Sequence, residues 1–193
     1  GSALLIQQME PKARMDLLQE LFGQSTNAIS ISYLRISVGA SDLSETVFSY
    51  NDLAAGETDT LLNQFSLSRD TLYLIPLLQQ ILAINPSVKF MATPWSPPTW
   101  MKTNRQSIGG SLIPQYYNTY AKYLAKYIQA MKEKGILIDA LTIQNEPEHG
   151  GNNPSMLMTA DEQASFIKNH LGPIFNQYVI KTKIVIWDHN CDH

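Results

Sequence analysis

The protein has 193 residues, 44% of them hydrophobic, and its 14 basic and 17 acidic side chains give a net charge of −3. This is the composition of a globular domain with enough chain to bury a core. The sequence has no basic stripe or polybasic cluster, which argues against nucleic acid or an anionic membrane as partner, and its apolar runs are too short for a membrane span. The single cysteine, Cys191, excludes an internal disulfide.

The first part of the chain predicts a helix, a strand and a second helix. The opening helix is expected at about Pro11–Phe22, and the run Ile29–Val38, rich in β-branched residues, predicts a strand. Ser68 fits the N-cap of a helix over Arg69–Ile84. Pro76 should kink or restart that helix, because proline lacks the N–H that a helix interior needs.

The middle of the chain continues the alternation. The run Val88–Thr93 predicts a second strand. Apolar and aromatic residues recur every three to four positions over Tyr116–Lys134, which predicts an amphipathic helix that Gly135 ends. The run Ile138–Ile143 predicts a third strand.

The last part adds one helix and one strand. Thr159 and Glu162 form the pattern of a capping box, which predicts a helix that ends before Gly172-Pro173. The run Lys183–Trp187 predicts a fourth strand. Strands that alternate with helices favour an α/β fold in which a parallel sheet is joined by helical crossovers.

Long polar connections follow the predicted strands, whereas the connections that precede them are short. In α/β barrels the loops at the carboxyl ends of the strands carry the chemistry. Here those loops are Ser37–Asp52, Pro94–Leu112, Gln144–Met158 and Asp188–His193.

Glu146 is the first candidate for a catalytic residue. It follows the predicted strand in the run LTIQNEPEHG, directly after Asn145 and before Pro147. Cleavage of a glycoside needs a carboxylic acid beside the leaving oxygen, and an amide next to it can bind a sugar hydroxyl. A solvated glutamate in a turn is the simpler alternative, but the position at a strand end favours the catalytic role.

Two tryptophans lie in the stretch TPWSPPTW after the second strand, in a loop that three prolines stiffen. Flat indole faces suit the C–H faces of sugar rings. We expect one indole to belong to the core and the other to meet a substrate, with Trp95 favoured for the second role over Trp100 because it is nearer the strand end.

Arg35 and Asp42 flank the end of the first predicted strand. An arginine inside a strand needs a partner, so Arg35 is expected to point inward and orient a carboxylate, and Asp42 could accept hydrogen bonds from sugar hydroxyls. A structural ion pair remains an equal alternative to a ligand contact.

Acidic and histidine residues near the two last loops invite a metal hypothesis: Glu148, His149, Asp188, His189, Asp192 and His193. Their spacings match no known helical metal motif, so no metal and no cofactor are expected. Asp188 and His189 follow the last predicted strand, where a contact with substrate is expected.

Several long motifs together resemble glycoside hydrolase family 30, which includes glucosylceramidases and endo-β-1,6-glucanases. The matching stretches, in order, are YLRISVGASDLSETVFSYND, FMATPWSPPTWMKTN, GGSL, LTIQNEPEHGGNNPSMLM and DEQASFIKNHLGP. The run after Asn145-Glu146 is more similar to the β-1,6-glucanase branch.

The resemblance implies a (β/α)₈ TIM barrel with retaining chemistry on a β-glucoside or β-glucan, in a secreted or periplasmic protein. It implies that Glu146 is the general acid/base, that Asn145 binds the 2-hydroxyl, that Asp42 and Trp95 hold the glucose, and that Arg35 supports the site.

The resemblance also implies that residues 1–193 are a single fragment of the catalytic domain. The predicted elements correspond to about strands 2–5 with their helices, and strand 1 and strands 6–8 are absent. The family's nucleophile is a second glutamate at the end of strand seven, so it is not in this chain. Glu148 is a poor substitute, because it lies only two residues beyond Glu146 and past a proline.

A partial barrel has consequences for activity and association. The chain alone is expected to be inactive, and its exposed edges predict self-association or swapping. Two other functions remain open: a sugar-binding fragment without catalysis that uses Trp95, Asp42 and Asn145, and a metal-dependent hydrolase built on His149, Asp188 and His189.

Overall fold

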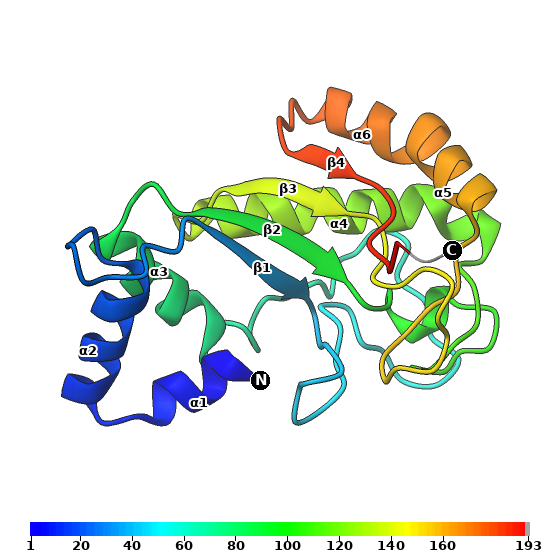
Figure 1. Ribbon diagram of the computed structural model, residues 1–193. Coiled ribbons are helices and arrows are strands. Elements are labelled where there is room, and N and C mark those ends of the chain that lie inside the picture. Colours follow the sequence, from blue (N-terminus) through cyan, green and yellow to red (C-terminus); the bar gives the residue numbers. More distant parts are fainter. Residues whose placement is uncertain (192–193) are drawn as a thin grey trace.

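A computed structural model describes residues 1–191 and contains one parallel sheet with the strand order β1-β2-β3-β4. The strands are β1 (Tyr33–Val38), β2 (Lys89–Pro94), β3 (Ile138–Thr142) and β4 (Lys183–Val185). Figure 1 shows them side by side with their carboxyl ends toward the same loops. The alternation of strands and helices predicted from the sequence is confirmed. Both ends of each strand lie within a few residues of the predicted bounds.

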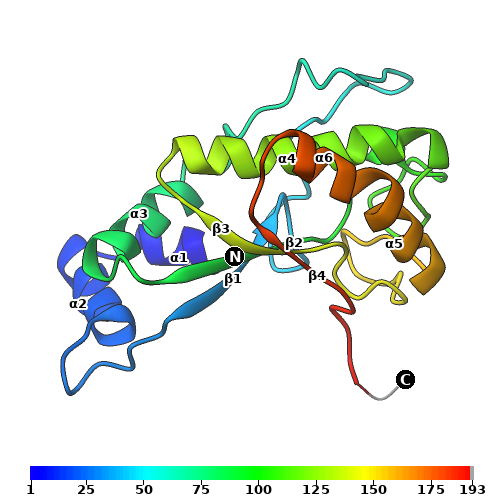
Figure 2. The same ribbon diagram turned by 90° about the horizontal axis from the view of Figure 1, so that it is seen from above.

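Helices connect successive strands, and Figure 2 shows the long helix α4 running beside the sheet. The α-helices are α1 (Ser2–Gln8), α2 (Pro11–Phe22), α3 (Leu74–Ile84), α4 (Tyr117–Glu133), α5 (Ala160–Phe166) and α6 (Gly172–Gln177). Shorter helical segments are η1 (Thr99–Met101), η2 (Pro114–Tyr116) and the π-helical η3 (Ile167–Leu171).

Helix α4 supplies much of the core. Its stripe is completely buried at Tyr120, Leu124, Tyr127 and Met131, which confirms the periodicity in the sequence. Gly135 follows the helix with a φ of 79°, a left-handed conformation that glycine adopts without strain.

A buried aromatic cluster fastens the loop after β1 to this helix. The Tyr50 ring stacks on Tyr127, with centroids 5.5 Å apart and planes 6° apart. The Tyr50 hydroxyl donates a 2.6 Å hydrogen bond to the buried carboxylate of Asp70. Burial raises the pKa of Asp70 to about 6, against the lowering effect of the Tyr50 hydrogen bond.

The predicted end of the helix over Arg69–Ile84 is confirmed, but its predicted start after an N-cap at Ser68 is wrong. Helix α3 starts at Leu74, and turns occupy the residues before it. Pro76 therefore falls in the first helical turn, where its missing N–H breaks no intrahelical bond. A helix begun at Arg69 would have placed the ring against a carbonyl of the preceding turn.

The prediction that a helix ends before Gly172-Pro173 is also wrong. The capping box of Thr159 and Glu162 is present, but α5 passes through the π-helical segment η3 into α6. A widened π turn changes the hydrogen-bond register, and Pro173 lies in the first turn of α6, where it is tolerated.

The face of the sheet away from α4 remains partly open. Tyr33 and Val185 are exposed there, on the two outer strands β1 and β4. The Tyr33 hydroxyl donates a 2.6 Å hydrogen bond to Asp139, which also pairs with Lys183 at 3.3 Å. Within residues 1–191, no helix has the length and apolar character that crossing a bilayer requires.

Candidate active site

The backbone after β3 is fixed between the ends of its two neighbouring strands. The Asn145 N–H donates to the Pro94 carbonyl at 2.8 Å, and the Glu146 N–H donates to the Asp188 carbonyl at 2.8 Å. An isolated parallel bridge joins Asn145 to Asp188. The segment that the sequence marks as catalytic therefore lies at the carboxyl edge of the sheet, where three strand ends meet.

Arg35 joins three of the predicted site residues. One guanidinium nitrogen donates to Asn145 Oδ1 and to Asp188 Oδ2, both at 2.8 Å. The guanidinium also lies 4.7 Å from the centroid of the Trp95 ring, and Thr142 Oγ1 donates to the same Asp188 oxygen at 2.8 Å. The carboxylate that Arg35 orients is thus Asp188.

The orientation of the Asn145 amide follows from this contact. A guanidinium can only donate, so Asn145 must present its oxygen to Arg35 and turn its Nδ2 group elsewhere. No residue in the described part of the chain accepts a hydrogen bond from this Nδ2. The Asn145 side chain can therefore donate to a ligand hydroxyl.

Trp95 is held by a residue that the sequence analysis gave no role. Gln144 Nε2 donates to the Trp95 carbonyl at 2.7 Å and to the Asn145 carbonyl at 3.0 Å. The Trp95 side chain is buried, and its Nε1 has no hydrogen-bond partner within residues 1–191, nor does Gln144 Oε1. Buried polar atoms are nearly always paired, so these two atoms are exceptions, as are the hydroxyls of Tyr120 and Tyr127 in the core.

Glu146 is half-buried, and its carboxylate has a definite partner. Asn152 Nδ2 donates to Glu146 Oε2 at 2.6 Å. The backbone of Glu146 has a φ of 42°, a left-handed conformation that is strained for a residue with a side chain. Such strain is concentrated at functional sites, where surrounding contacts hold it.

A buried lysine fastens the two loops around Glu146. Lys102 is completely buried, and its Nζ donates to the carbonyls of Ser107 at 3.0 Å and Ser155 at 2.6 Å. The Ser155 N–H donates to the Ser107 carbonyl at 2.9 Å. Burial lowers the pKa of Lys102 to about 8. Nothing in the sequence points to Lys102, because its partners are backbone carbonyls and one of them lies 53 residues further along the chain.

Trp100 belongs to the core. Its Nε1 donates to the carbonyl of Asn51 at 3.0 Å and to Asn51 Oδ1 at 3.1 Å, and its ring meets Tyr116 edge-on at 5.1 Å. The expectation that one of the two indoles is a core residue is met by Trp100. Contact of Trp95 with a substrate stays a prediction.

Two other predicted site residues lie in the loops after β1 and β4. Asp42 is exposed in the loop after β1, and no described residue hydrogen-bonds to its carboxylate. His189 is half-buried, with its ring centroid 5.7 Å from that of Trp187, and its Nδ1 accepts a 2.8 Å hydrogen bond from the Asn190 N–H.

The metal hypothesis gains no support from the part of the chain that the structure describes, where no three His, Cys, Asp or Glu side chains gather as ligands. Glu148 and His149 are exposed. Asp192 and His193, which the hypothesis also used, lie outside the described residues.

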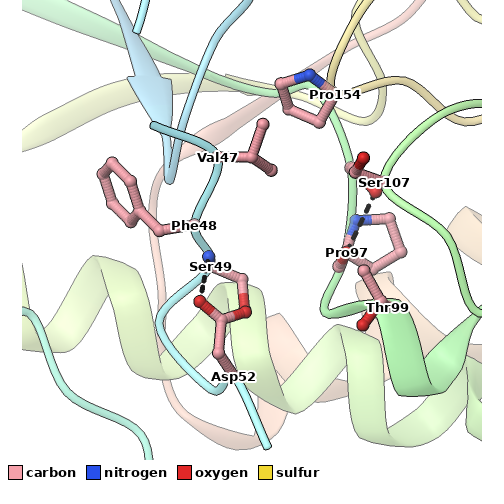
Figure 3. A pocket seen from close by; sticks show the side chains of 9 residues that line it. Val47, Phe48, Ser49, Asp52, Pro97, Thr99, Ser107 and Pro154 are labelled. Atoms are coloured by element: carbon pink, nitrogen blue, oxygen red, sulfur yellow. Dashed lines mark hydrogen bonds between the residues drawn. The ribbon is translucent and has the colours of Figure 1, made fainter. Parts of the chain in front are cut away.

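A small cavity of about 20 Å³ lies at the rim, where the loops after β1, β2 and β3 meet (Figure 3). Its wall includes Phe48, Pro97 and Pro154, and Asp52 accepts hydrogen bonds from the N–H and hydroxyl of Ser49 beside it. This volume holds about one water molecule. It is too small for a sugar ring.

Comparisons with known proteins identify the relatives of this chain. The family model described as the glycosyl hydrolase family 30 TIM-barrel domain matches residues 1–192. An endo-1,6-beta-D-glucanase of Neurospora crassa is 36% identical over 174 residues, which cover 87% of this chain and 36% of that protein. The mouse lysosomal acid glucosylceramidase is 33% identical over 199 residues, which cover 97% of this chain and 38% of that protein.

Solved structures agree with these sequence matches. The endo-beta1,6-glucanase BT3312 superposes with a TM-score of 0.91 at 38% identity, over 98% of this chain and 42% of that chain. SrfJ from Salmonella typhimurium superposes with a TM-score of 0.90 at 32% identity, with the same coverage. The chain therefore spans about two fifths of the length of the relatives it matches.

Proposed function

The chain belongs to glycosyl hydrolase family 30, and from this we propose that the complete protein is a retaining β-glycosidase with Glu146 as its general acid/base. The contact between Glu146 Oε2 and Asn152 carries the proposal, because it fixes the carboxylate beside Asn145 at the carboxyl edge of the sheet. Glu146 gives its proton to the leaving oxygen in the first step. In the second step it removes a proton from the attacking water.

The substrate-binding roles follow from the contacts around Arg35. Asn145 donates its Nδ2 to a sugar hydroxyl, because Arg35 occupies its oxygen. The Trp95 indole, which the Arg35 guanidinium covers, lines the same site. Arg35 and Asp188 hold this arrangement rather than take part in bond making.

Asp42 and His189 complete the proposed sugar contacts from the loops after β1 and β4. The exposed carboxylate of Asp42 is available to accept hydrogen bonds from hydroxyls. His189 follows Asp188 directly, and its ring lies at the same end of the sheet.

Retention of configuration needs a second carboxylate, about 5–5.5 Å from the first. Glu148 is exposed and lies past Pro147, so it does not fit this role. We place the nucleophile in a part of the protein outside residues 1–193, in the missing strands of a complete barrel. The same reasoning makes this sequence a fragment that is inactive by itself.

The proposed substrate is a β-1,6-linked glucan. The names of the endo-1,6-beta-D-glucanase of Neurospora crassa and of the structural neighbour BT3312 support this choice. A glucosylceramide is the second candidate, because the mouse lysosomal acid glucosylceramidase is 33% identical. The family resemblance also favours a secreted or periplasmic location.

The role of Glu146 is tested with Glu146→Gln in the complete protein. The glutamine cannot give a proton, so kcat/KM for a β-1,6-gluco-oligosaccharide should fall by at least about 100-fold. An aryl glucoside with an activated leaving group needs no proton, so its kcat/KM should fall far less. Glu148→Gln is the matched control, and an equal, negligible loss on both substrates for Glu146→Gln would exclude the acid/base role.

A further inference from the structure

The Glu146 carboxylate is held on one side only. Its Oε2 accepts the 2.6 Å hydrogen bond from Asn152 Nδ2, and no described residue hydrogen-bonds to Oε1. A single bond of this kind leaves the two oxygens unequal: one is tied to the protein and the other is available to a substrate.

We propose that Asn152 is a positioning residue that makes Oε1 of Glu146 the oxygen that carries and transfers the catalytic proton. The inference rests on the proposed role of Glu146 as acid/base. The side-chain amide nitrogen of Asn152 can only donate, and the hydroxyl oxygen of a carboxylic acid is a weaker acceptor than its carbonyl oxygen, so this contact favours the proton on Oε1. When Glu146 is protonated, Oε2 is the carbonyl oxygen of the acid and still accepts from Asn152.

The hydrogen bond therefore persists through both steps of the reaction. In the first step the nucleophile bonds to the sugar carbon and the O–H bond at Oε1 breaks, so that the proton moves to the departing oxygen, which keeps the electrons of the broken glycosidic bond. In the second step Oε1 takes a proton from water as the water oxygen bonds to the sugar carbon and the bond between that carbon and the nucleophile breaks. The carboxylate does not need to rotate between these steps.

Asn152 itself lies between two fixed points of its loop. Ser155 Oγ donates to the Gly150 carbonyl at 3.0 Å and accepts from the Gly109 N–H at 2.9 Å. The buried Lys102 ammonium holds the Ser155 carbonyl at 2.6 Å. The loop after β2 thus secures the segment 150–155, and this segment presents the Asn152 amide to Glu146.

Backbone hydrogen bonds hold Glu146, the partner of Asn152, in place. The Glu146 N–H donates to the Asp188 carbonyl at 2.8 Å, and the Glu146 carbonyl accepts from the His149 N–H at 2.9 Å. With both residues held, loss of the Asn152 amide frees the Glu146 carboxylate to rotate. A misplaced acid slows proton transfer without weakening sugar binding.

The test compares Asn152→Ala, Asn152→Asp and Asn153→Ala in the complete protein. Asn152→Asp keeps the size of the side chain but replaces the donor, so it serves even if the alanine variant folds poorly. Asn153 is the matched control, because its exposed side chain lies in the same loop and hydrogen-bonds to no described residue.

We expect both Asn152 variants to lower kcat on a β-1,6-gluco-oligosaccharide by about 10-fold or more, with KM within about twofold. Hydrolysis of an aryl glucoside with an activated leaving group should stay close to wild type in its first step. Asn153→Ala should match wild type on both substrates.

Other outcomes separate the two hypotheses. If Glu146→Gln gives the large selective loss but both Asn152 variants behave as wild type, or Asn153→Ala loses as much as they do, the role of Asn152 is overturned and that of Glu146 stands. If Glu146→Gln itself gives no selective loss, the proposed function fails, and the inference fails with it.

Discussion

Arg35 is the residue that orders the site, although its own side chain is about one third exposed, at 35%. It neutralises Asp188 at 2.8 Å, covers the Trp95 ring and fixes the Asn145 amide in one orientation. A lysine at this position would offer one compact charge and no flat surface to lie on the indole. The arrangement therefore depends on the shape of the guanidinium as well as on its charge.

The buried carboxyl group of Asp70 should make the stability of the protein depend on pH. Its pKa of about 6 in the folded protein lies above the value of about 3.9 expected for the unfolded chain. The folded state therefore holds the proton more tightly, and the contribution of Asp70 to stability is fully present below about pH 4 and is lost as the pH rises through 6.

Asp70→Asn should remove this dependence in the complete protein. The asparagine oxygen still accepts from the Tyr50 hydroxyl, and no charge is buried. The free energy of unfolding of the variant should rise relative to wild type between pH 4 and pH 7, by up to about 3 kcal/mol. Denaturant unfolding across this range measures it, with Glu45→Gln as an exposed control. Parallel pH profiles for wild type and Asp70→Asn would contradict the prediction.

The loops are the elements that decide the geometry of the site, and Lys102 is their common anchor. Its ammonium has two carbonyl partners and is completely buried. A buried ammonium without a carboxylate is costly, as its lowered pKa shows. The two hydrogen bonds offset that cost, and the one to Ser155 joins the loop after β2 to the loop after β3.

Lys102→Met should loosen these loops. The methionine fills a similar volume but leaves the buried Ser155 carbonyl without a donor, so the free energy of unfolding should fall by about 2 kcal/mol at pH 7. Thermal unfolding of the complete protein measures the loss. Lys122→Met, at an exposed position of α4, should change little. Equal thermal unfolding midpoints for the two variants would show that the hydrogen bonds of Lys102 do not stabilise the loops.

The helices and strands could be predicted from the sequence where a local pattern of residues determines them. The stripe on α4 and the capping box of Thr159 are local signals, and both are present in the structure. The predicted helix boundaries near Pro76 and Pro173 were wrong. A proline is tolerated in the first turn of a helix, and only the three-dimensional structure shows which turn is the first.

The site residues, too, could be predicted where local sequence places them and could not where long-range contacts place them. Glu146, Asn145 and Trp95 stand directly after predicted strands, so the parallel sheet alone brings them to one edge. Asn152 and Lys102 reach the site through the path of their loops, and that path depends on contacts between distant residues. No periodicity in the sequence encodes those contacts, although both residues lie within stretches that match the family.

At the scale of the whole molecule, four parallel strands of the family 30 fold are joined by their crossover helices. The chain spans 36% of the Neurospora crassa relative and 42% of BT3312. Within residues 1–191, β1 and β4 each pair with one neighbour only. The proposed reaction needs a second carboxylate opposite Glu146, and a closed barrel of the complete protein would supply both that group and the missing neighbours.

The most direct measurement is chemical rescue of Glu146→Ala in the complete protein by azide, with an activated aryl β-glucoside as substrate. Without its base the variant should accumulate the glucosyl-enzyme, and azide, which needs no base to attack, should accelerate turnover and yield β-glucosyl azide. Wild-type turnover should not respond to azide. Failure of azide to accelerate the variant, or a product with the α configuration, would show that Glu146 is not the acid/base of a retaining enzyme.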